Sequence, residues 1–333
     1  MADENNTLTI EDLRTHFFTR NGVLPAVGGV NISLPRKKIV GVVGESGSGK
    51  SVTALSILRL VSYPGKIVSG KITLDGEDIL SKTSKEMRHI RGNRISMIFQ
   101  EPMTSLNPVY TVGRQVGEAI MLHQNVSKSD ARDITVEMFK TVGIPEAEKR
   151  FRSYPHQLSG GLRQRVMIAM AMVCHPRLMI ADEPTTALDV TIEAQILYLM
   201  KELEQKHDTS IMLITHNMGV VAEICDYVYV MYAGKIVEQA SVFDLFDRTK
   251  HPYTIGLLNS IPKPTEEKQK LYNIKGMVPN LLRLPQGCSF SPRCEKVMPE
   301  CLKREPELCL AAPGHSVRCF LHQSGGMGGG VNE

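Results

Sequence analysis

The glycine-rich segment Gly44-Glu45-Ser46-Gly47-Ser48-Gly49-Lys50-Ser51 constrains this chain more than any other feature. It fills the pattern G-x-x-x-x-G-K-[ST] and follows the apolar run Ile39 to Val43, so a short buried strand leads into a glycine loop. Glycines let backbone N–H groups turn towards phosphate oxygens, and a helix beginning near Lys50 adds its positive dipole end. We expect Lys50 to contact the β- and γ-phosphates of a nucleotide and the Ser51 hydroxyl to hold Mg²⁺. A glycine turn that binds no nucleotide is the alternative for this segment alone.

Composition sets broad limits on the class of protein. The chain has 333 residues, of which 42% are hydrophobic, so we expect a globular core and about two domains. Its net charge of +4 comes from 39 basic and 35 acidic residues without a long basic block, which argues against nucleic acid as a partner. The N-terminus is polar and apolar runs such as Val166 to Cys174 are too short to span a bilayer, so we expect a cytosolic chain.

Short apolar runs alternate with helical patterns along the chain, which predicts an α/β fold with a parallel sheet. Leu178 to Ala181 and Ile211 to Ile214 are apolar tetrads that end at polar residues, as central parallel strands do. Between about Val112 and Gly161 the pattern is helical, which predicts a helical insertion. After about His251 the composition becomes rich in Pro and Cys, so we place a boundary near residue 250.

A second motif places two carboxylates at the end of a buried strand. Asp182 and Glu183 directly follow the tetrad that ends at Ala181, and ligands of open α/β sheets bind at the carboxyl ends of strands. We expect Asp182 to hold Mg²⁺ through water, and Glu183 to orient or deprotonate the water that attacks the γ-phosphate. A strand-ending turn is the alternative for this motif alone, but the glycine loop and the carboxylates explain each other.

A third motif, Leu158-Ser159-Gly160-Gly161, precedes an apolar helix, so Ser159 is expected to be an N-cap beside exposed N–H groups suited to a phosphate. Alone it would be only a helix start. Together the chain carries six ordered motifs: the loop at 44–51, Gln100, Leu158 to Gly161, Asp182-Glu183, Ala187-Leu188-Asp189 and His216. Over about residues 8–246 they resemble those of the nucleotide-binding subunits of ABC transporters.

The resemblance implies a role for each matching position. Gln100 would touch Mg²⁺ and sense a membrane partner, His216 would contact the γ-phosphate, and Asp189 would link two active sites across a dimer. The usual adenine-stacking tyrosine is absent; Phe17 is our choice for that role, and Phe18 is the alternative. The predicted nucleotide site comprises Phe17, Gly44, Glu45, Ser46, Gly47, Ser48, Gly49, Lys50, Ser51, Gln100, Ser159, Gly160, Gly161, Asp182 and Asp189, with Glu183, His216 and Lys50 catalytic and Ser51, Gln100 and Asp182 as Mg²⁺ ligands.

In this family two such domains meet head to tail, so that the glycine loop of one and the Ser-Gly-Gly of the other enclose each ATP. ATP would close the dimer and hydrolysis would reopen it, which can drive a membrane partner. The resemblance therefore predicts a P-loop ABC domain over residues 7–250, built from a RecA-like core, an antiparallel β subdomain and a helical subdomain at about 112–165. A small Cys-rich C-terminal domain is expected over 251–323, followed by a flexible tail at 324–333.

Finer residues indicate a branch of the family. The segment from Gln100 to Pro108, the segment His251-Pro252-Tyr253-Thr254 and the cysteine-bearing tail resemble the ATP-binding subunits of bacterial and archaeal di- and oligopeptide importers. Glu101 replaces the usual aspartate there but keeps the carboxylate. A nickel or other small-solute importer is the alternative within this branch. A soluble ABC ATPase of DNA repair or translation is disfavoured because one cassette without a long coiled-coil insertion is present, and a dead regulatory module because the catalytic residues are intact.

The branch also implies partners and a place of action. We expect a second ATPase subunit, a different paralogue in preference to a second copy, together with two transmembrane permease subunits and an extracytoplasmic substrate-binding protein. The chain would sit as a peripheral protein on the cytoplasmic face of the inner membrane. Its activity would be ATP hydrolysis coupled to uptake of di- or oligopeptides.

Five of the seven cysteines lie in the last fifth of the chain, whereas Cys174 and Cys225 lie alone in apolar contexts. All five fall within 32 residues, and in a cytosolic chain four or more cysteines so close together favour a metal over disulfides. With Cys309 left out, the other four are separated by five, six and seventeen intervening residues, which differs from paired zinc motifs, although zinc and unliganded thiols stay open. The resemblance to peptide-importer ATPases implies a structural 4Fe–4S cluster, with Cys309 free and with the ligands Cys288, Cys294, Cys301 and Cys319.

Overall fold

The computed structural model describes residues 5–100, 105–186, 188–261 and 273–323. Its strands are β1 (Asn6–Thr19), β2 (Gly22–Pro35), β3 (Ile39–Val43), β4 (Gly65–Leu74), β5 (Glu77–Asp78), β6 (Ile95–Ile98), β7 (Leu178–Asp182), β8 (Ser210–Thr215), β9 (Tyr227–Tyr232), β10 (Lys235–Ser241), β11 (Cys309–Ala312) and β12 (His315–Val317). The predictions for 101–104, Ala187 and the tail 324–333 lie outside the described residues.

The helices alternate with these strands as the sequence predicts. They are α1 (Lys50–Ile57), α2 (Ser84–Ile90), α4 (Val112–His123), α5 (Lys128–Thr141), α6 (Ala147–Arg150), α7 (Gly160–Met172), α8 (Val190–His207), α9 (Met218–Ile224), α10 (Val242–Asp247), α11 (Pro252–Asn259) and α12 (Pro299–Lys303), with 3₁₀ turns η1 (Pro155–Gln157), η2 (Leu281–Arg283), η3 (Ser291–Arg293) and η4 (Phe320–His322). Within the described ranges, no helix is both long and apolar enough to cross a bilayer.

The described strands include a large sheet in the order β11-β12-β10-β9-β3-β8-β7-β6, in which β9, β3, β8, β7 and β6 are parallel neighbours. Its central strands are buried along their whole length and are apolar except at their ends, because both faces are covered. In β8, Ile211 and Leu213 enter one hydrophobic core with α7, α8 and α9, whereas Met212 and Ile214 enter the other with α1 and the smaller sheet. This two-sided burial is the reason that the predicted apolar tetrads form central strands.

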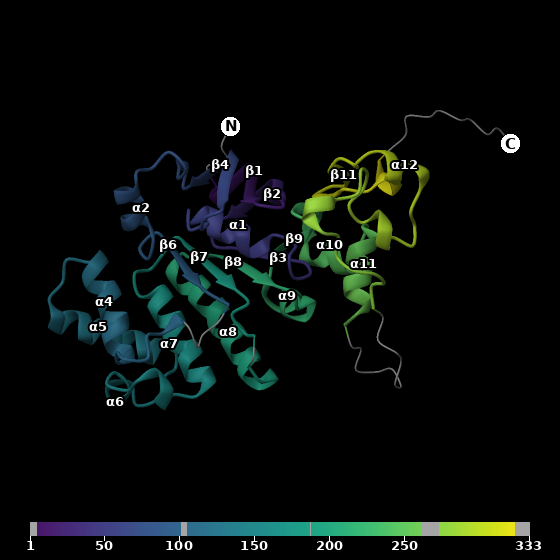
Figure 1. The fold of residues 1–333 in the computed structure, drawn as a ribbon. Coiled ribbons are helices and arrows are strands. Elements are labelled where there is room, and N and C mark those ends of the chain that lie inside the picture. The colour runs from purple at the N-terminus through teal and green to yellow at the C-terminus, as the bar shows by residue number, and fades with distance from the viewer. Residues whose placement is uncertain (1–4, 101–104, 187, 262–272, 324–333) are drawn as a thin grey trace.

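The second sheet is antiparallel, with the order β2-β1-β4-β5. It covers the face of the large sheet that carries α1 (Figure 1). On the other side of the molecule, α4, α5 and α7 pack on one another near β6, at one edge of the large sheet. This is the segment for which the sequence predicts a helical insertion.

The C-terminal segment extends the large sheet. β12 pairs with β10, and β11 pairs with β12, so residues after 300 add to the edge opposite β6. Glu238 of β10 fixes the connection: its buried carboxylate accepts hydrogen bonds from the backbone of Lys250 and His251, and it lies 2.7 Å from Nε2 of His315. The segment is therefore anchored to the body of the protein by both backbone pairing and a buried ionisable group.

Candidate nucleotide-binding site

The glycine loop lies where the sequence predicts it, between the end of β3 and the start of α1. Two of its glycines are required by their surroundings. Gly44 has φ 153°, and a Cβ there would lie 2.2 Å from the Met231 carbonyl oxygen; Gly49 has φ 105°, and a Cβ there would lie 2.4 Å from the Ala26 carbonyl oxygen. Both backbone conformation and space thus exclude side chains at the two ends of the loop.

Lys50 points back into the loop. Its Nζ donates to the carbonyl oxygens of Gly44 at 2.7 Å and Glu45 at 3.0 Å, and the residue is only 6% exposed. Burial lowers the pKa of Lys50, whereas the nearby carboxylates of Glu183, Asp182 and Glu45 act in the opposite direction. The Lys50 amino group is therefore held at the loop by hydrogen bonds that a phosphate group can replace.

A cavity of about 350 Å³ opens in front of the loop. Phe17 and Leu24 of the small sheet line it together with loop residues 46–51, and Gln100 and Glu183 also line it. Phe18 is not among its lining residues and is 49% exposed, so the geometry favours Phe17 of the two candidates for stacking. Leu281 of η2 is a lining residue that the sequence analysis missed, because no local pattern links it to the glycine loop 230 positions earlier.

Asp182 ends β7 and is 4% exposed. Burial raises its pKa, while hydrogen bonding to Ser51 lowers it. Its Oδ1 is buried without a hydrogen-bond partner, which is costly for a carboxylate unless a cation occupies the site. This orphaned oxygen beside the Ser51 hydroxyl fits Mg²⁺, which prefers hard oxygen ligands and is bound by few protein groups when it also holds phosphates.

The carboxylate of Glu183 contacts two other predicted site residues, His216 and Gln100. His216 Nδ1 lies 3.0 Å from one of its carboxylate oxygens, and the Gln100 amide and the Thr186 hydroxyl each donate to the other oxygen at 3.0 Å. Burial alone would raise the pKa of Glu183, but these neighbours outweigh it and the pKa is lowered. Glu183 is therefore an ionised carboxylate at neutral pH. Thr186 was missed by the sequence analysis, although its place three residues after Glu183 could have indicated it.

Other predicted residues lie outside this cavity. Ser159 is the exposed N-cap of α7, where its side chain accepts from the Leu162 amide at 3.3 Å. Asp189 caps α8 by accepting from the Ile192 amide at 2.9 Å. Neither these two residues nor Gly160 and Gly161 line the cavity of their own chain. The capping geometry predicted for Ser159 is present, while the phosphate contact stays a prediction.

The predicted metal ligands of the C-terminal segment are close but do not form a site for a single ion. Among the described residues, no group of three or more His, Cys, Asp or Glu side chains is arranged to hold a metal ion. Burial, together with the neighbouring Cys288, Cys294 and Cys301, raises the pKa of Cys319 to about 11, so the four thiols share one neighbourhood. The structure gives no direct support for the predicted cluster, and Cys309 stands apart with its Sγ directed at the carbonyl oxygens of Val317 and His322.

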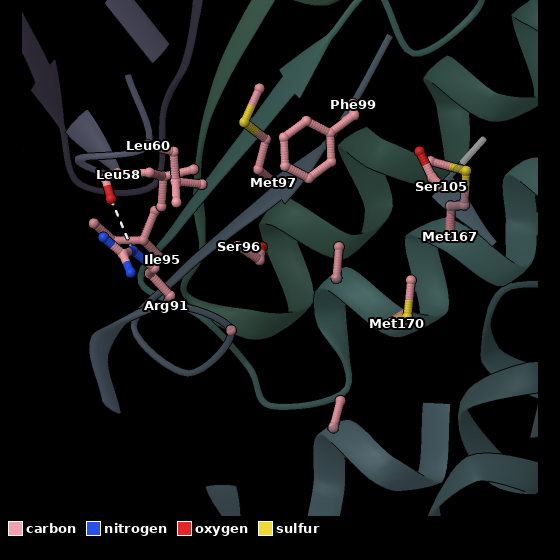
Figure 2. Close-up of a pocket in the computed structure, with 13 residues that line it drawn as sticks. Leu58, Leu60, Arg91, Ile95, Ser96, Met97, Phe99, Ser105, Met167 and Met170 are labelled. Atoms are coloured by element: carbon pink, nitrogen blue, oxygen red, sulfur yellow. Dashed lines mark hydrogen bonds between the residues drawn. The ribbon is translucent and has the colours of Figure 1, made fainter. Parts of the chain in front are cut away.

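A second hollow of about 640 Å³ lies beside β6 and is mainly apolar (Figure 2). Met97 and Phe99 lie on its β6 side, and Met167 and Met170 come from α7 (Figure 2). Arg91 closes one end through a hydrogen bond from its Nε to the Leu58 carbonyl at 2.8 Å. Phe99 lines the hollow, and the next residue along the chain, Gln100, lines the cavity at the glycine loop.

A glycine loop between β3 and α1, with two carboxylates at the end of β7, a parallel strand of the same sheet, defines a P-loop nucleotide-binding domain. The family profile described as ABC transporter matches residues 27–186, and the profile described as oligopeptide/dipeptide transporter, C-terminal region, matches residues 237–301. A dimeric ATP-binding cassette, MJ0796, solved in a post-hydrolysis state bound to ADP and Pi, superposes with a TM-score of 0.64 at 25% identity, covering 71% of this chain and 98% of that chain.

Full-length relatives define the branch. The chain is 53% identical to the oligopeptide transport ATP-binding protein AppD of Bacillus subtilis, over 96% of this chain and 98% of the relative. It is 50% identical to the oligopeptide transport ATP-binding protein OppD of Escherichia coli, over 94% of this chain and 92% of the relative. The chain therefore belongs to the ABC transporter family, in its branch of oligopeptide transport ATP-binding proteins.

Proposed function

We propose that this chain is the ATP-hydrolysing subunit that energises uptake of di- or oligopeptides through a membrane ABC importer. The observation that carries the proposal is identity of about half, over more than nine-tenths of the chain, to oligopeptide transport ATP-binding proteins, in a chain whose Lys50, Gln100 and Glu183 line one cavity with the glycine loop. Phosphoryl transfer to water needs positioning and charge neutralisation more than covalent chemistry, and the site supplies both.

Each group has a role in the proposed reaction. Lys50 exchanges its backbone carbonyl partners for the β- and γ-phosphates of ATP. Ser51 and Asp182 hold Mg²⁺, which neutralises charge on the phosphates when it is bound. Glu183 accepts the proton of the attacking water, and the hydrogen bonds from Gln100, Thr186 and His216 orient its carboxylate. Phe17 stacks on the adenine ring.

A second ATPase subunit completes the site in this proposal. Ser159, Gly160 and Gly161 lie at the exposed start of α7 and do not line the cavity of their own chain, which supports their acting on the ATP of a partner subunit. Closure of the pair around two ATP molecules and reopening after hydrolysis transmits energy by differential binding of the nucleotide to two states. A paralogue serves as that partner.

We further propose that the hollow beside β6 receives a segment of a permease subunit. Its apolar wall is rich in flexible methionine side chains, which adapt to varied partners, and it adjoins Gln100, which contacts the catalytic carboxylate. Two permease subunits and an extracytoplasmic binding protein then complete an importer on whose inner face this chain is a peripheral subunit.

The C-terminal cysteine segment holds a 4Fe–4S cluster in this proposal. The supporting observation is that the four predicted ligand thiols share one neighbourhood.

The proposal is tested by isolating the assembled transporter. The tagged chain is purified from membranes in a mild detergent, and the proteins recovered with it are identified by mass spectrometry. The complex is then reconstituted in vesicles with its binding protein. We expect polytopic membrane subunits to be recovered and ATP hydrolysis to be stimulated by di- or oligopeptides. Stimulation by Ni²⁺ and not by peptides would assign the chain to the metal-importing alternative, and recovery without membrane subunits would refute a transport role.

A further inference from the structure

The glycine loop and the cysteine-bearing segment are joined by a bidentate ion pair. Arg293 of η3 donates from Nη1 to Oε2 of Glu45 at 2.6 Å and from Nη2 to Oε1 at 3.0 Å. Glu45 is the second residue of the loop, and Arg293 directly precedes Cys294. The Arg293 side chain is only 4% exposed and that of Glu45 is 28% exposed, so this pair is partly shielded from water, unlike fully exposed surface pairs of little energetic consequence.

Arg293 is fixed on its own side as well. Its Nε donates to the Lys275 carbonyl at 3.1 Å, and Nη2 also donates to the Ile274 carbonyl at 3.4 Å. The loop residue is held a second time, because the Glu45 amide donates to the Tyr253 hydroxyl at 2.8 Å. Both the side chain and the backbone of Glu45 are therefore held by residues that follow position 250.

The pair has an electrostatic consequence for the nucleotide site. The carboxylate of Glu45 is close enough to Lys50 to act on its ammonium group, which is the group expected to meet the phosphates. An uncompensated carboxylate at this place repels a triphosphate and competes for Lys50. Arg293 neutralises that carboxylate without entering the cavity, since it is not a lining residue. The same C-terminal segment also lines the cavity directly, through Leu281.

We propose that Arg293 is a positioning residue of the nucleotide site: by pairing with Glu45 it fixes the glycine loop and removes a repulsive charge, so that the C-terminal segment is required for tight binding of nucleotide. This inference rests on the proposed nucleotide site. It extends that site by a residue 242 positions beyond the end of the glycine loop. Because linkage is reciprocal, nucleotide binding in turn stabilises the packing of the C-terminal segment on the loop.

The test is a double-mutant cycle on the full chain, with Mg-ATP affinity measured by calorimetry under conditions without turnover. Arg293→Gln leaves the Glu45 carboxylate unpaired and is expected to weaken affinity roughly tenfold. Glu45→Gln removes the carboxylate itself. The double variant Glu45→Gln/Arg293→Gln has neither charge and is expected to return to within about threefold of Glu45→Gln alone. Arg304→Gln is the matched control, because Arg304 pairs with Glu300 in the same segment but both are exposed.

The outcomes separate the possibilities. Wild-type affinity in Arg293→Gln overturns the proposal, as does a double variant that binds as weakly as Arg293→Gln, because a merely structural role of Arg293 is not rescued by changing Glu45. Lys50→Ala is measured in parallel: if it binds as well as wild type, the proposed nucleotide site itself is wrong, whatever Arg293 does. Should Arg293→Gln fail to fold, Arg293→Lys keeps the neutralising charge, and a tenfold loss of affinity there contradicts the proposal.

Discussion

Replacing Glu183 with Gln tests the assignment of the catalytic base. Three donors converge on its carboxylate, each at 3.0 Å, so the group is ionised and aligned before any nucleotide binds. The amide of Gln is nearly the same size but can accept at only one end and cannot take a proton from water. Glu183 has φ 48°, and Gln tolerates this conformation as Glu does, so the substitution adds no backbone strain.

The expected loss follows from the role of the carboxylate. A positioned general base contributes about 10²- to 10⁴-fold, which corresponds to about 2.7 to 5.4 kcal/mol of transition-state stabilisation. Binding is expected to persist, because Lys50 is held by the loop carbonyls and not by Glu183, and because the variant removes a negative charge beside the phosphates. The variant should therefore bind ATP at least as tightly as wild type and accumulate as closed dimers.

Phosphate release by the reconstituted complex measures turnover, and size-exclusion chromatography with ATP measures dimer closure. Glu193→Gln is the matched control, because Glu193 accepts a hydrogen bond from Thr185 of the same loop but does not line the cavity. We expect that control to retain activity within about threefold, an effect far below the loss of a general base. Turnover of Glu183→Gln within about threefold of wild type would refute the assignment.

Three further predictions concern other parts of the chain. Ser159→Phe should spare ATP binding by the isolated chain and impair hydrolysis only in the complex; a tenfold loss of affinity in the isolated chain would contradict an action across the dimer. Burial lowers the pKa of His251 to about 4, below its unfolded value near 6.5, so the unfolded state binds more protons and the unfolding free energy should fall by up to about 3 kcal/mol between pH 6.5 and 4. His251→Asn keeps an acceptor for the Tyr253 amide. When the unfolding free energy of this variant is measured in urea at several pH values, it should depend less steeply on pH than that of wild type. An unchanged pH dependence would mean that another group titrates. Anaerobically purified protein should be brown with about four irons per chain, and should lose iron in Cys301→Ser but not in Cys309→Ser. Colourless protein with one zinc would exclude the cluster, and the reverse pattern of iron loss would exclude only the choice of ligands.

The central part of the fold could be predicted because its signal is local. The tetrads at 178–181 and 211–214 became β7 and β8 with boundaries moved by only a residue, since both faces of these strands are buried and all residues of the two tetrads are apolar. The catalytic cluster followed from the same logic. Glu183 and His216 come shortly after neighbouring parallel strands, so their side chains meet at one edge of the sheet.

The parts that could not be predicted depend on pairings between distant segments. β1 is a single strand of 14 residues, but register shifts around Leu13 break the alternation that would reveal it. β12 has three residues, and it joins the large sheet by pairing with β10, about 77 positions earlier. Its three residues are too few to show a periodic pattern of their own. The pairing of Glu45 with Arg293 spans 248 positions and leaves no periodic signal at all.

In the proposed roles, two distant parts of the chain act on the nucleotide site. Gln100 contacts Glu183 and directly follows Phe99, which lines the hollow proposed to receive a permease segment. In this proposal, a segment bound in the hollow acts on Phe99 and, through the adjoining Gln100, on the hydrogen bond to Glu183. From the opposite side, Arg293 holds Glu45, whose carboxylate acts on Lys50. Occupancy of the hollow thus acts on Glu183, the proposed base, whereas the C-terminal segment acts on Lys50, the proposed phosphate ligand. We therefore expect variants in the hollow to change the rate of ATP turnover, and variants in the C-terminal segment to change nucleotide affinity.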